Sequence, residues 1–320
     1  MQSPLSRRLA TLVAALTACL AGQVPAQTWP ARPVQAVVGF SAGGTVDVMA
    51  RALVAAMSSQ LGQTISVTNR EGAAGTIGFA QVAQAPPDGY LLAAGPTTPI
   101  SIAPHLMKNL QFNVESFEYV CQSFENVFTV AVGLNSPYKS AADLIAAARA
   151  NPGKLTYGHS GVGTVPHLSV ANLAYRSGVD MTAVAYKGEN PMLPDVISGR
   201  LDFGAPSVGI AIGQKLRVLA VFADSRHPSF PDAPTFSELG MPSMPPGLNG
   251  LFAPKGTPRA VMATLERACE QAVASDAFRA VANRLNQRVA YLPGAAFAER
   301  AAADYRYKGE LIRALNIRAE

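Results

Sequence analysis

The chain has 320 residues and is poor in charge, in aromatic residues and in cysteine. Charged residues make up 15%, aromatic residues 7%, and there are three cysteines. The net charge of +5 is spread without a block of Lys or Arg, and few aromatic residues are present to stack on bases, which argues against a nucleic-acid-binding protein. Hydrophobic residues reach 49%, which with the low net charge excludes intrinsic disorder. What is present is enough apolar sequence for about two domains.

An export signal is predicted at the N-terminus. Arg7 and Arg8 precede the apolar run Leu9–Ala21, which is shorter than the ~20 residues of a membrane helix. Small residues then lead to Ala26, as a signal peptidase requires. We therefore predict a signal peptide over residues 1–26 and a mature protein in the periplasm.

The three cysteines bear on membrane anchoring and on disulfide formation. Cys19 ends a stretch, residues 16–19, that resembles a lipobox. Acylation of Cys19 would make the protein a lipoprotein. The apolar Leu20 argues against this alternative, because a polar residue is usual at that position. Cys121 lies in an apolar, strand-like stretch and Cys269 on a predicted helix. Export permits a disulfide between them, but these settings favour two buried free thiols, and the pairing stays open.

The rest of the sequence alternates predicted strands with predicted helices. Short apolar runs predict strands at residues 34–40, 64–67, 90–94, 128–134, 155–158, 182–186, 201–203 and 217–222. Apolar residues at helical spacing predict helices at residues 45–61, 76–85, 141–151, 165–175, 191–198, 258–275, 276–285 and 295–316. We expect Thr45 and Ser140 to cap the helices that begin there. The alternation predicts an α/β fold.

Two loops carry the clearest functional signal. Residues 41–45 and 160–164 each follow a predicted strand, precede a predicted helix and are rich in glycine and hydroxyl residues. In open α/β sheets ligands bind at the carboxyl ends of strands, where helix N-termini attract anions. One such loop in each half of the chain predicts a cleft for a small carboxylate. For either loop alone, an ordinary connection between strand and helix is the alternative.

Catalytic and metal-binding motifs are incomplete. Residues 158–162 resemble a nucleophile elbow but lack its last glycine. An exported α/β hydrolase that uses Ser160, with His159 or His167 and Asp202, stays open as an alternative. The four histidines show no metal-ligand spacing with one another or with cysteine, so we expect neither a metal nor a cofactor.

Several short motifs occur together in the order found in one family. They are Ser41–Asp47, Asn69–Gly78, Pro87–Tyr90, Ser160–Leu168, Tyr186–Gly188, Gly199–Asp202, Pro231–Thr235 and Ala253–Pro258. Through them the chain resembles the Bug family, the solute-binding proteins of tripartite tricarboxylate transporters, over nearly all of its mature length. It departs from the family at Leu248, where a tryptophan is common, and at His159, where a small residue is frequent. The identity of the ligand is therefore not transferred.

The resemblance implies a two-lobed clamshell of the periplasmic-binding-protein type, each lobe a mostly parallel sheet flanked by helices. Lobe 1 would comprise residues 27–127 and about 223–320, and lobe 2 residues 128–222. Such a protein captures a small carboxylate between its lobes and delivers it to the membrane permease subunits of the transporter. It is not an enzyme, and we expect a monomer. A ligand-presenting partner of a membrane sensor is an alternative with the same pocket.

The match also implies which residues bind the ligand. Backbone N–H groups of the two loops would hold the carboxylate, hydroxyl groups after the third strand would add donors, and Asp202 would face an amino group or a water. From the residues alone, Asp47 and His167 also have structural interpretations, as a partner of the helix dipole and as a support of its loop. The expected ligand-binding set is Ser41, Ala42, Gly43, Gly44, Asp47, Thr97, Thr98, Ser160, Gly161, Gly163, Thr164, His167 and Asp202.

Overall fold

The computed structural model of the protein describes residues 29–223, 225–240 and 244–317. Residues 32–320 form one compact unit. The predicted signal peptide and Cys19 lie outside the described residues. None of the helices in the described ranges has both the length and the apolar character needed to cross a membrane.

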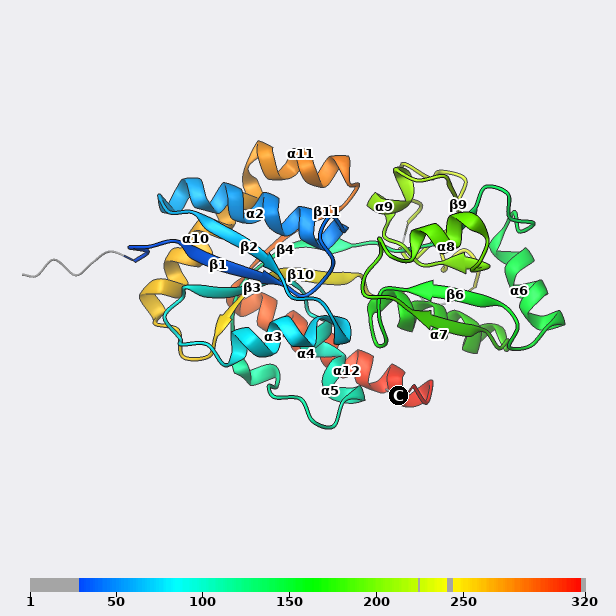
Figure 1. The fold of residues 1–320 in the computed structure, drawn as a ribbon, viewed down its shortest axis with the longest axis horizontal. Helices are drawn as coiled ribbons and strands as arrows, with labels where there is room; N and C mark the ends of the chain where they lie inside the picture. The colour runs from blue at the N-terminus through cyan, green and yellow to red at the C-terminus, as the bar shows by residue number, and fades with distance from the viewer. Residues whose placement is uncertain (1–28, 224, 241–243, 318–320) are drawn as a thin grey trace, which may run out of the picture. The chain divides into compact units, whose positions relative to one another are not determined.

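The first of two sheets has six strands in the order β11-β4-β10-β3-β1-β2 (Figure 1). Their bounds are β1 Val34–Val38, β2 Ile65–Asn69, β3 Leu91–Pro96, β4 Phe117–Asn126, β10 Gly247–Pro254 and β11 Arg288–Pro293. β1 pairs in parallel with β2 and β3, whereas β10 is antiparallel to both β3 and β4, and β11 is antiparallel to β4.

The second sheet has five strands in the order β7-β6-β8-β5-β9. Their bounds are β5 Thr129–Gly133, β6 Thr156–His159, β7 Thr182–Ala185, β8 Phe203–Gly204 and β9 Leu216–Val221. β6 is parallel to β7 and β8, and β5 is antiparallel to β8 and β9. Each sheet with its helices makes one lobe, which we call the first and the second lobe.

Both sheets are mixed, so the prediction of mostly parallel sheets was wrong. The reason lies in the chain path. β4 leads out of the first sheet into the second, and β10 leads back beside it. Neighbouring strands that leave and return must run in opposite directions. The predicted strands included none of β4, β10 and β11, which form the antiparallel part of the first sheet. They did include β5 and β9, but the pattern does not fix the direction of these strands, which pair antiparallel in the second sheet.

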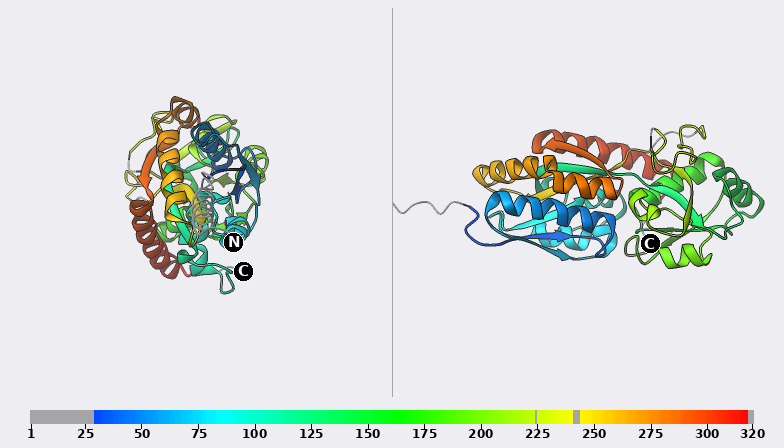
Figure 2. Two further views of the ribbon diagram at one scale, coloured as in Figure 1. Left: turned by 90° about the vertical axis from the view of Figure 1, so that its left-hand side faces the viewer. Right: turned by 90° about the horizontal axis from the view of Figure 1, so that it is seen from above.

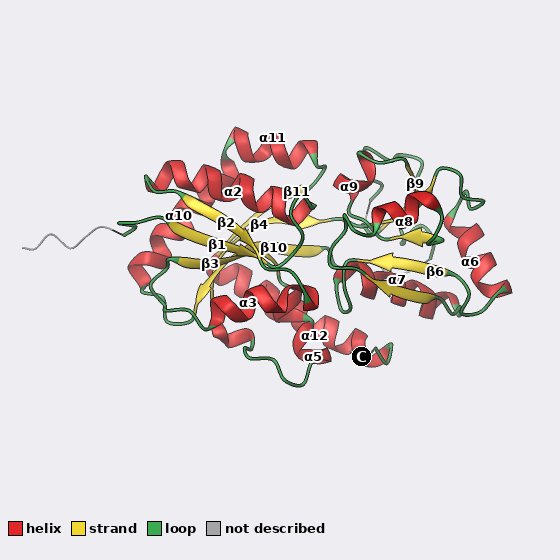
Figure 3. Cartoon of the chain, in the orientation of Figure 1, coloured by secondary structure: helices red, strands yellow, loops and turns green. Residues whose placement is uncertain are grey.

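Helices cover both faces of each sheet (Figures 2 and 3). On one face of the first sheet lie α2 Thr45–Leu61, α10 Arg259–Ala274 and α11 Asp276–Arg284. On the other lie α3 Thr76–Ala83, α4 Thr98–Ser101, α5 Ala103–Leu106 and α12 Gly294–Ala314. The second sheet packs between α6 Ala141–Ala150 with α7 Val165–Ser177, and α8 Leu193–Ser198 with α9 Val208–Ile212. Short 3-10 turns occur at η1 Ala73–Gly75 and η2 Val114–Ser116.

The ends of the helices follow their sequence signals with one exception. Ser140 caps α6, its hydroxyl accepting from the amide of Asp143 while the Asp143 carboxylate accepts from the amide of Ser140. α2 ends at Gly62, which adopts the left-handed conformation at φ 65°. Thr45 does not cap α2 as expected, because the cap position is Gly44 and no side chain caps the helix there.

Cys121 and Cys269 form a disulfide, which overturns the expectation of free thiols. Cys121 lies in the central strand β4 and Cys269 on α10, which packs against that strand, with the two Cα atoms 6.6 Å apart. Both residues are fully buried. The sequence places each thiol in apolar surroundings, but only the packing of α10 on β4 brings the two together across 148 residues.

Removal of this disulfide will lower the free energy of unfolding by about 2–5 kcal/mol, because it closes a long loop of the unfolded chain. The measurement is denaturant unfolding of the mature protein with and without reductant, beside the double variant Cys121→Ala/Cys269→Ala. Reductant should lower the midpoint of the wild type to that of the variant and leave the variant unchanged. Equal midpoints for wild type and variant without reductant would contradict the prediction.

Candidate functional site

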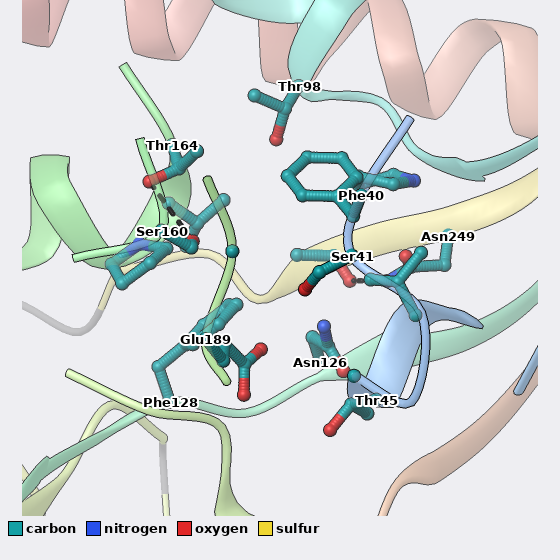
Figure 4. A pocket seen from close by; sticks show the side chains of 17 residues that line it. Phe40, Ser41, Thr45, Thr98, Asn126, Phe128, Ser160, Thr164, Glu189 and Asn249 are labelled. Atoms are coloured by element: carbon teal, nitrogen blue, oxygen red, sulfur yellow. Dashed lines mark hydrogen bonds between the residues drawn. The ribbon is translucent and has the colours of Figure 1, made fainter. Parts of the chain in front are cut away.

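The two glycine-rich loops of the sequence meet at one cavity between the lobes. Ser41 and Gly44 of the first loop line it together with Ser160 and Thr164 of the second (Figure 4). Both loops lie at the carboxyl ends of parallel strands, β1 and β6. The cavity measures about 30 Å³ over the positions open to the centre of a water molecule, room for about two waters.

Direct contacts hold the lobes closed around this cavity. The Thr45 hydroxyl on α2 lies 2.6 Å from the Ser207 hydroxyl in the second lobe. The Asn190 side chain donates to the carbonyl oxygen of Ala42 at 3.2 Å. The cavity therefore lies against both lobes. Its room for about two waters is smaller than a ligand of several heavy atoms, so such a ligand binds between the lobes only if these contacts loosen.

Two helix N-termini face the cavity, one from each lobe. Gly44, Thr45 and Val46 begin α2 and line it, as do Thr164 and Val165 at the start of α7. Neither helix has a side chain that caps its first amide groups. Free N–H groups and the positive end of the dipole make such a terminus an anion site. No Lys, Arg or His lines the cavity among the described residues, so the backbone is its main source of positive potential.

Asp47 shapes the first loop without reaching the cavity. Its buried carboxylate accepts hydrogen bonds from the amide of Gly43 at 2.9 Å, from Asn69 at 2.8 Å and from Arg51 at 3.0 Å. Burial alone would raise the pKa of Asp47, but these hydrogen bonds outweigh it and lower the pKa. The charged Asp47 side chain on α2 therefore stabilises the conformation of the first loop. Within that loop Gly43 adopts the left-handed φ of 75° that the turn requires.

A pair of buried histidines supports the second loop. The rings of His159 and His167 stack with centroids 4.3 Å apart. The amide of Gly163 donates to Nδ1 of His167 at 3.0 Å, and Nδ1 of His159 lies 2.8 Å from the carbonyl oxygen of Gly161. Burial lowers the pKa of His159 to about 3 and that of His167 to about 4. Both rings are therefore neutral at pH 7, and His167 braces the loop rather than lining the cavity.

The expected site residues divide into three groups. Ser41, Gly44, Thr98, Ser160 and Thr164 line the cavity. The second group supports the two loops or lies within them without lining that cavity, and comprises Ala42, Gly43, Asp47, Gly161, Gly163 and His167. The third group comprises Thr97 and Asp202, whose side chains form hydrogen bonds away from the cavity.

The third group is a correction to the expected set. The Thr97 hydroxyl donates to Asp304 at 3.2 Å, inside the first lobe. The Asp202 carboxylate accepts from the amide and hydroxyl of Thr156, at 2.8 and 2.9 Å. Thr156 begins β6, whereas the second loop follows the end of that strand. Asp202 therefore lies at the opposite end of the sheet from the cavity.

The hydrolase alternative lacks its catalytic geometry. The Ser160 hydroxyl is 3.5 Å from that of Thr164, with which it forms its hydrogen bond. Nδ1 of His167 is occupied by the amide of Gly163, and Asp202 is bonded to Thr156. The three groups form no nucleophile–base–acid relay of the kind a hydrolase requires.

Several residues that line the cavity were not in the expected set. The ones with a carboxylate, amide or aromatic side chain are Phe40, Asn126, Phe128, Glu189 and Asn249. Asn126 and Phe128 flank the passage from β4 to β5, and Asn249 lies on β10, so they reach the cavity only because those strands cross between the lobes. Glu189 follows the predicted Tyr186–Gly188 motif, and no pattern in the sequence distinguishes it from a surface residue.

A two-lobed α/β fold with helix N-termini meeting in the cleft defines a solute-binding protein of the periplasmic type. The model of the tripartite tricarboxylate transporter family receptor matches residues 49–317. The chain is 32% identical over 313 residues to the UPF0065 protein in the gbd 5' region of Cupriavidus necator, covering 97% of this chain and 95% of that protein. The chain therefore belongs to the tripartite tricarboxylate transporter receptor family.

Solved structures confirm the predicted two-lobed α/β fold. The periplasmic binding protein BugD superposes with a TM-score of 0.86 at 29% identity, covering 91% of this chain and 100% of that one. Rpa4515 of R. palustris with adipate gives 0.86 at 28% identity, covering 91% and 99%. MatC of Rhodopseudomonas palustris with bound malate gives 0.82 at 28% identity, covering 89% and 100%.

Proposed function

We propose that this protein captures a small carboxylate in the cleft between its lobes, in the periplasm, and delivers it to the membrane permease of a tripartite tricarboxylate transporter. The observation that carries the proposal is the meeting of the α2 and α7 N-termini at one cavity. Two sets of uncapped amide groups can hold the two oxygens of a carboxylate without a cationic side chain. Adipate and malate in two structural neighbours are ligands of this chemical class.

We further propose the lobe boundaries expected from the sequence, residues 27–127 with about 223–320 for the first lobe and 128–222 for the second, with the return crossing moved to a later residue. The first crossing agrees with the strands, since the last residue of β4 is Asn126 and the first of β5 is Thr129. The return crossing lies later than residue 223. After β9 ends at Val221, that residue still pairs with Thr235, and the ring of Phe222 stacks on that of Phe236, so this segment belongs with the second lobe and the first lobe resumes near Gly247. The segments between these strands are where the chain would bend as the cleft opens.

Binding of carboxylates will raise the thermal stability of the mature protein. The protein is first unfolded and refolded to remove ligand carried from the cell, then heated with mono-, di- and tricarboxylates, aromatic acids and amino acids. A ligand at ~100 times its Kd adds about 2.7 kcal/mol to the free energy of unfolding. The amide of the same compound is the control, and should add none. If no carboxylate raises the midpoint above its amide, the proposed function is wrong.

A further inference from the structure

One buried acid in the cavity is not explained by capture of a carboxylate. Glu189 lies between β7 and α8, and its side chain lines the cavity beside Asn126 and Phe128 (Figure 4). It is only 7% exposed. A cavity whose helix N-termini attract an anion thus also holds an acidic side chain, which in its ionised form would repel a second carboxylate placed against it.

The hydrogen bonds of Glu189 satisfy one of its two oxygens. Oε2 accepts from the amide of Ser207 at 3.1 Å and from its hydroxyl at 2.6 Å. Within the described part of the chain, Oε1 has neither a hydrogen bond nor an ion pair. Burial raises the pKa of the Glu189 carboxyl, while the hydrogen bonds from Ser207 act to lower it. A buried carboxylate of this kind is stabilised when a cation pairs with it.

Other acceptors in the same cavity are also unused. Asn126 and Asn249 both line it, and Oδ1 of each is buried without a hydrogen-bond partner among the residues the structure describes. The amide nitrogen of Asn249 is already committed to the carbonyl oxygen of Gly247 at 2.9 Å. With Glu189, the residues that line the cavity therefore carry three side-chain oxygens without a hydrogen-bond partner in the described part of the chain, and these become acceptors for a ligand when the lobes part. An ammonium group carries three N–H donors and no acceptor.

The ring of Phe128 lies beside Glu189, and the ring of Phe40 lines the cavity farther away, beside Thr98 (Figure 4). Aromatic faces attract cations, and a carboxylate with aromatic rings is a common setting for an amine. We propose that Glu189 binds a protonated amine of the ligand, so that the protein selects an aminocarboxylate over a carboxylate without an amine. The carboxylate of that ligand is held at the helix N-termini, so this inference rests on the proposed function.

The test compares ligands that differ by one amine on the same carbon skeleton. Isothermal titration of the refolded mature protein uses glutamate against glutarate, alanine against propionate, 4-aminobutyrate against butyrate, and phenylalanine against 3-phenylpropionate. We expect at least one amine-bearing acid to bind tenfold or more tighter than its partner. This comparison needs no variant, so it does not depend on whether a substitution folds.

The variant Glu189→Gln then tests whether Glu189 causes the preference for the amine-bearing acid. Its amide oxygen still accepts from Ser207, but it carries no charge. We expect the amine-bearing acid to lose tenfold or more in affinity, while the partner acid binds the variant as well as the wild type or better. Glu299→Gln on the exposed side of α12 is the matched control and should change neither affinity.

Three outcomes would overturn the inference. In the first, each acid without the amine binds the wild type as tightly as its amine-bearing partner, or more tightly. A protonated Glu189 that donates to a carboxylate would give this result. The inference then fails, but the proposed function survives. In the second, Glu189→Gln weakens both members of a pair equally, which indicates a purely structural role. In the third, neither member of any pair binds, nor does any acid of the thermal panel, and the proposed function fails as well.

Discussion

Replacement of Gly44 by valine will weaken binding of the carboxylate by at least ~100-fold, equivalent to about 2.7 kcal/mol. Gly44 is the cap residue of α2 and lines the cavity. Its φ of −72° and ψ of 163° suit any residue, so the backbone dihedral angles allow the change. The added Cβ would lie 3.3 Å from the carbonyl oxygen of Ser41, so this loop must shift by a few tenths of an ångström. The valine methyl groups would occupy a cavity of only about 30 Å³ and hold the anion away from the α2 amides.

The measurement is titration of the Gly44→Val variant with the acid that most stabilises the wild type. Gly213→Val is the matched control, because Gly213 has a φ of −80° at the end of α9 and its added Cβ would come no closer than 3.9 Å to a neighbouring atom. The control should bind as the wild type does. Binding by Gly44→Val at wild-type affinity, with an unchanged thermal midpoint, would show that the first loop is not the anion site.

Acidification from pH 7 to pH 4 will destabilise the protein strongly, with His159 and His167 as the main contributors. Their pKa values in the folded protein, about 3 and about 4, lie below the usual ~6.5 of the unfolded chain. Between these limits the unfolded state binds protons that the folded state excludes. The free energy of unfolding therefore falls as the pH falls, by up to about 1.4 kcal/mol per pH unit for each histidine.

Denaturant unfolding at several pH values measures this slope. The amides of Gly161 and Gly163 donate to the two histidines at 3.2 and 3.0 Å. In the variant His159→Asn/His167→Asn each side chain can still accept from a loop amide but does not titrate, so its slope should be much flatter than that of the wild type. His227→Asn is the control, and should change the slope less, since His227 is only partly buried. The raised pKa of Glu189 acts in the opposite sense and offsets part of the loss. Equal slopes for wild type and double variant would exclude the pair as the cause.

The local structure of this protein is readable from its sequence. The apolar spacing of Val46, Met49, Leu53 and Met57 defined α2, and all four are buried. Ser140 and Gly62 marked helix ends because their local hydrogen bonding and backbone freedom act over a few residues only. The two anion-binding loops were found for the same reason, since a glycine-rich connection between a strand and a helix is a feature of neighbouring residues.

The predictions that failed were those that depended on residues far apart in the sequence. Thr45 bonds to Ser207 rather than capping its helix, and Asp202 is held by Thr156 at the far end of its sheet. Cys121 and Cys269 are paired because α10 happens to cover β4. In each case a local interaction of the side chain was plausible from the sequence, but in the folded protein the side chain interacts with a residue far away in the sequence.

The sequence by itself determined the α/β class, the two loops and the elements of the strand–helix alternation, because each of these is set by interactions within about one turn or one strand. It did not determine β4, β10 or β11, which none of the predicted strands covers. Only the tertiary structure decided which side chains surround the cavity. The antiparallel β4 and β10 bring Asn126 and Asn249 to the cleft, and packing within the second lobe buries Glu189 against Ser207. The two loops are set by neighbouring residues, whereas the side-chain acceptors around the cavity come from segments that are far apart in the sequence and meet only in the folded protein.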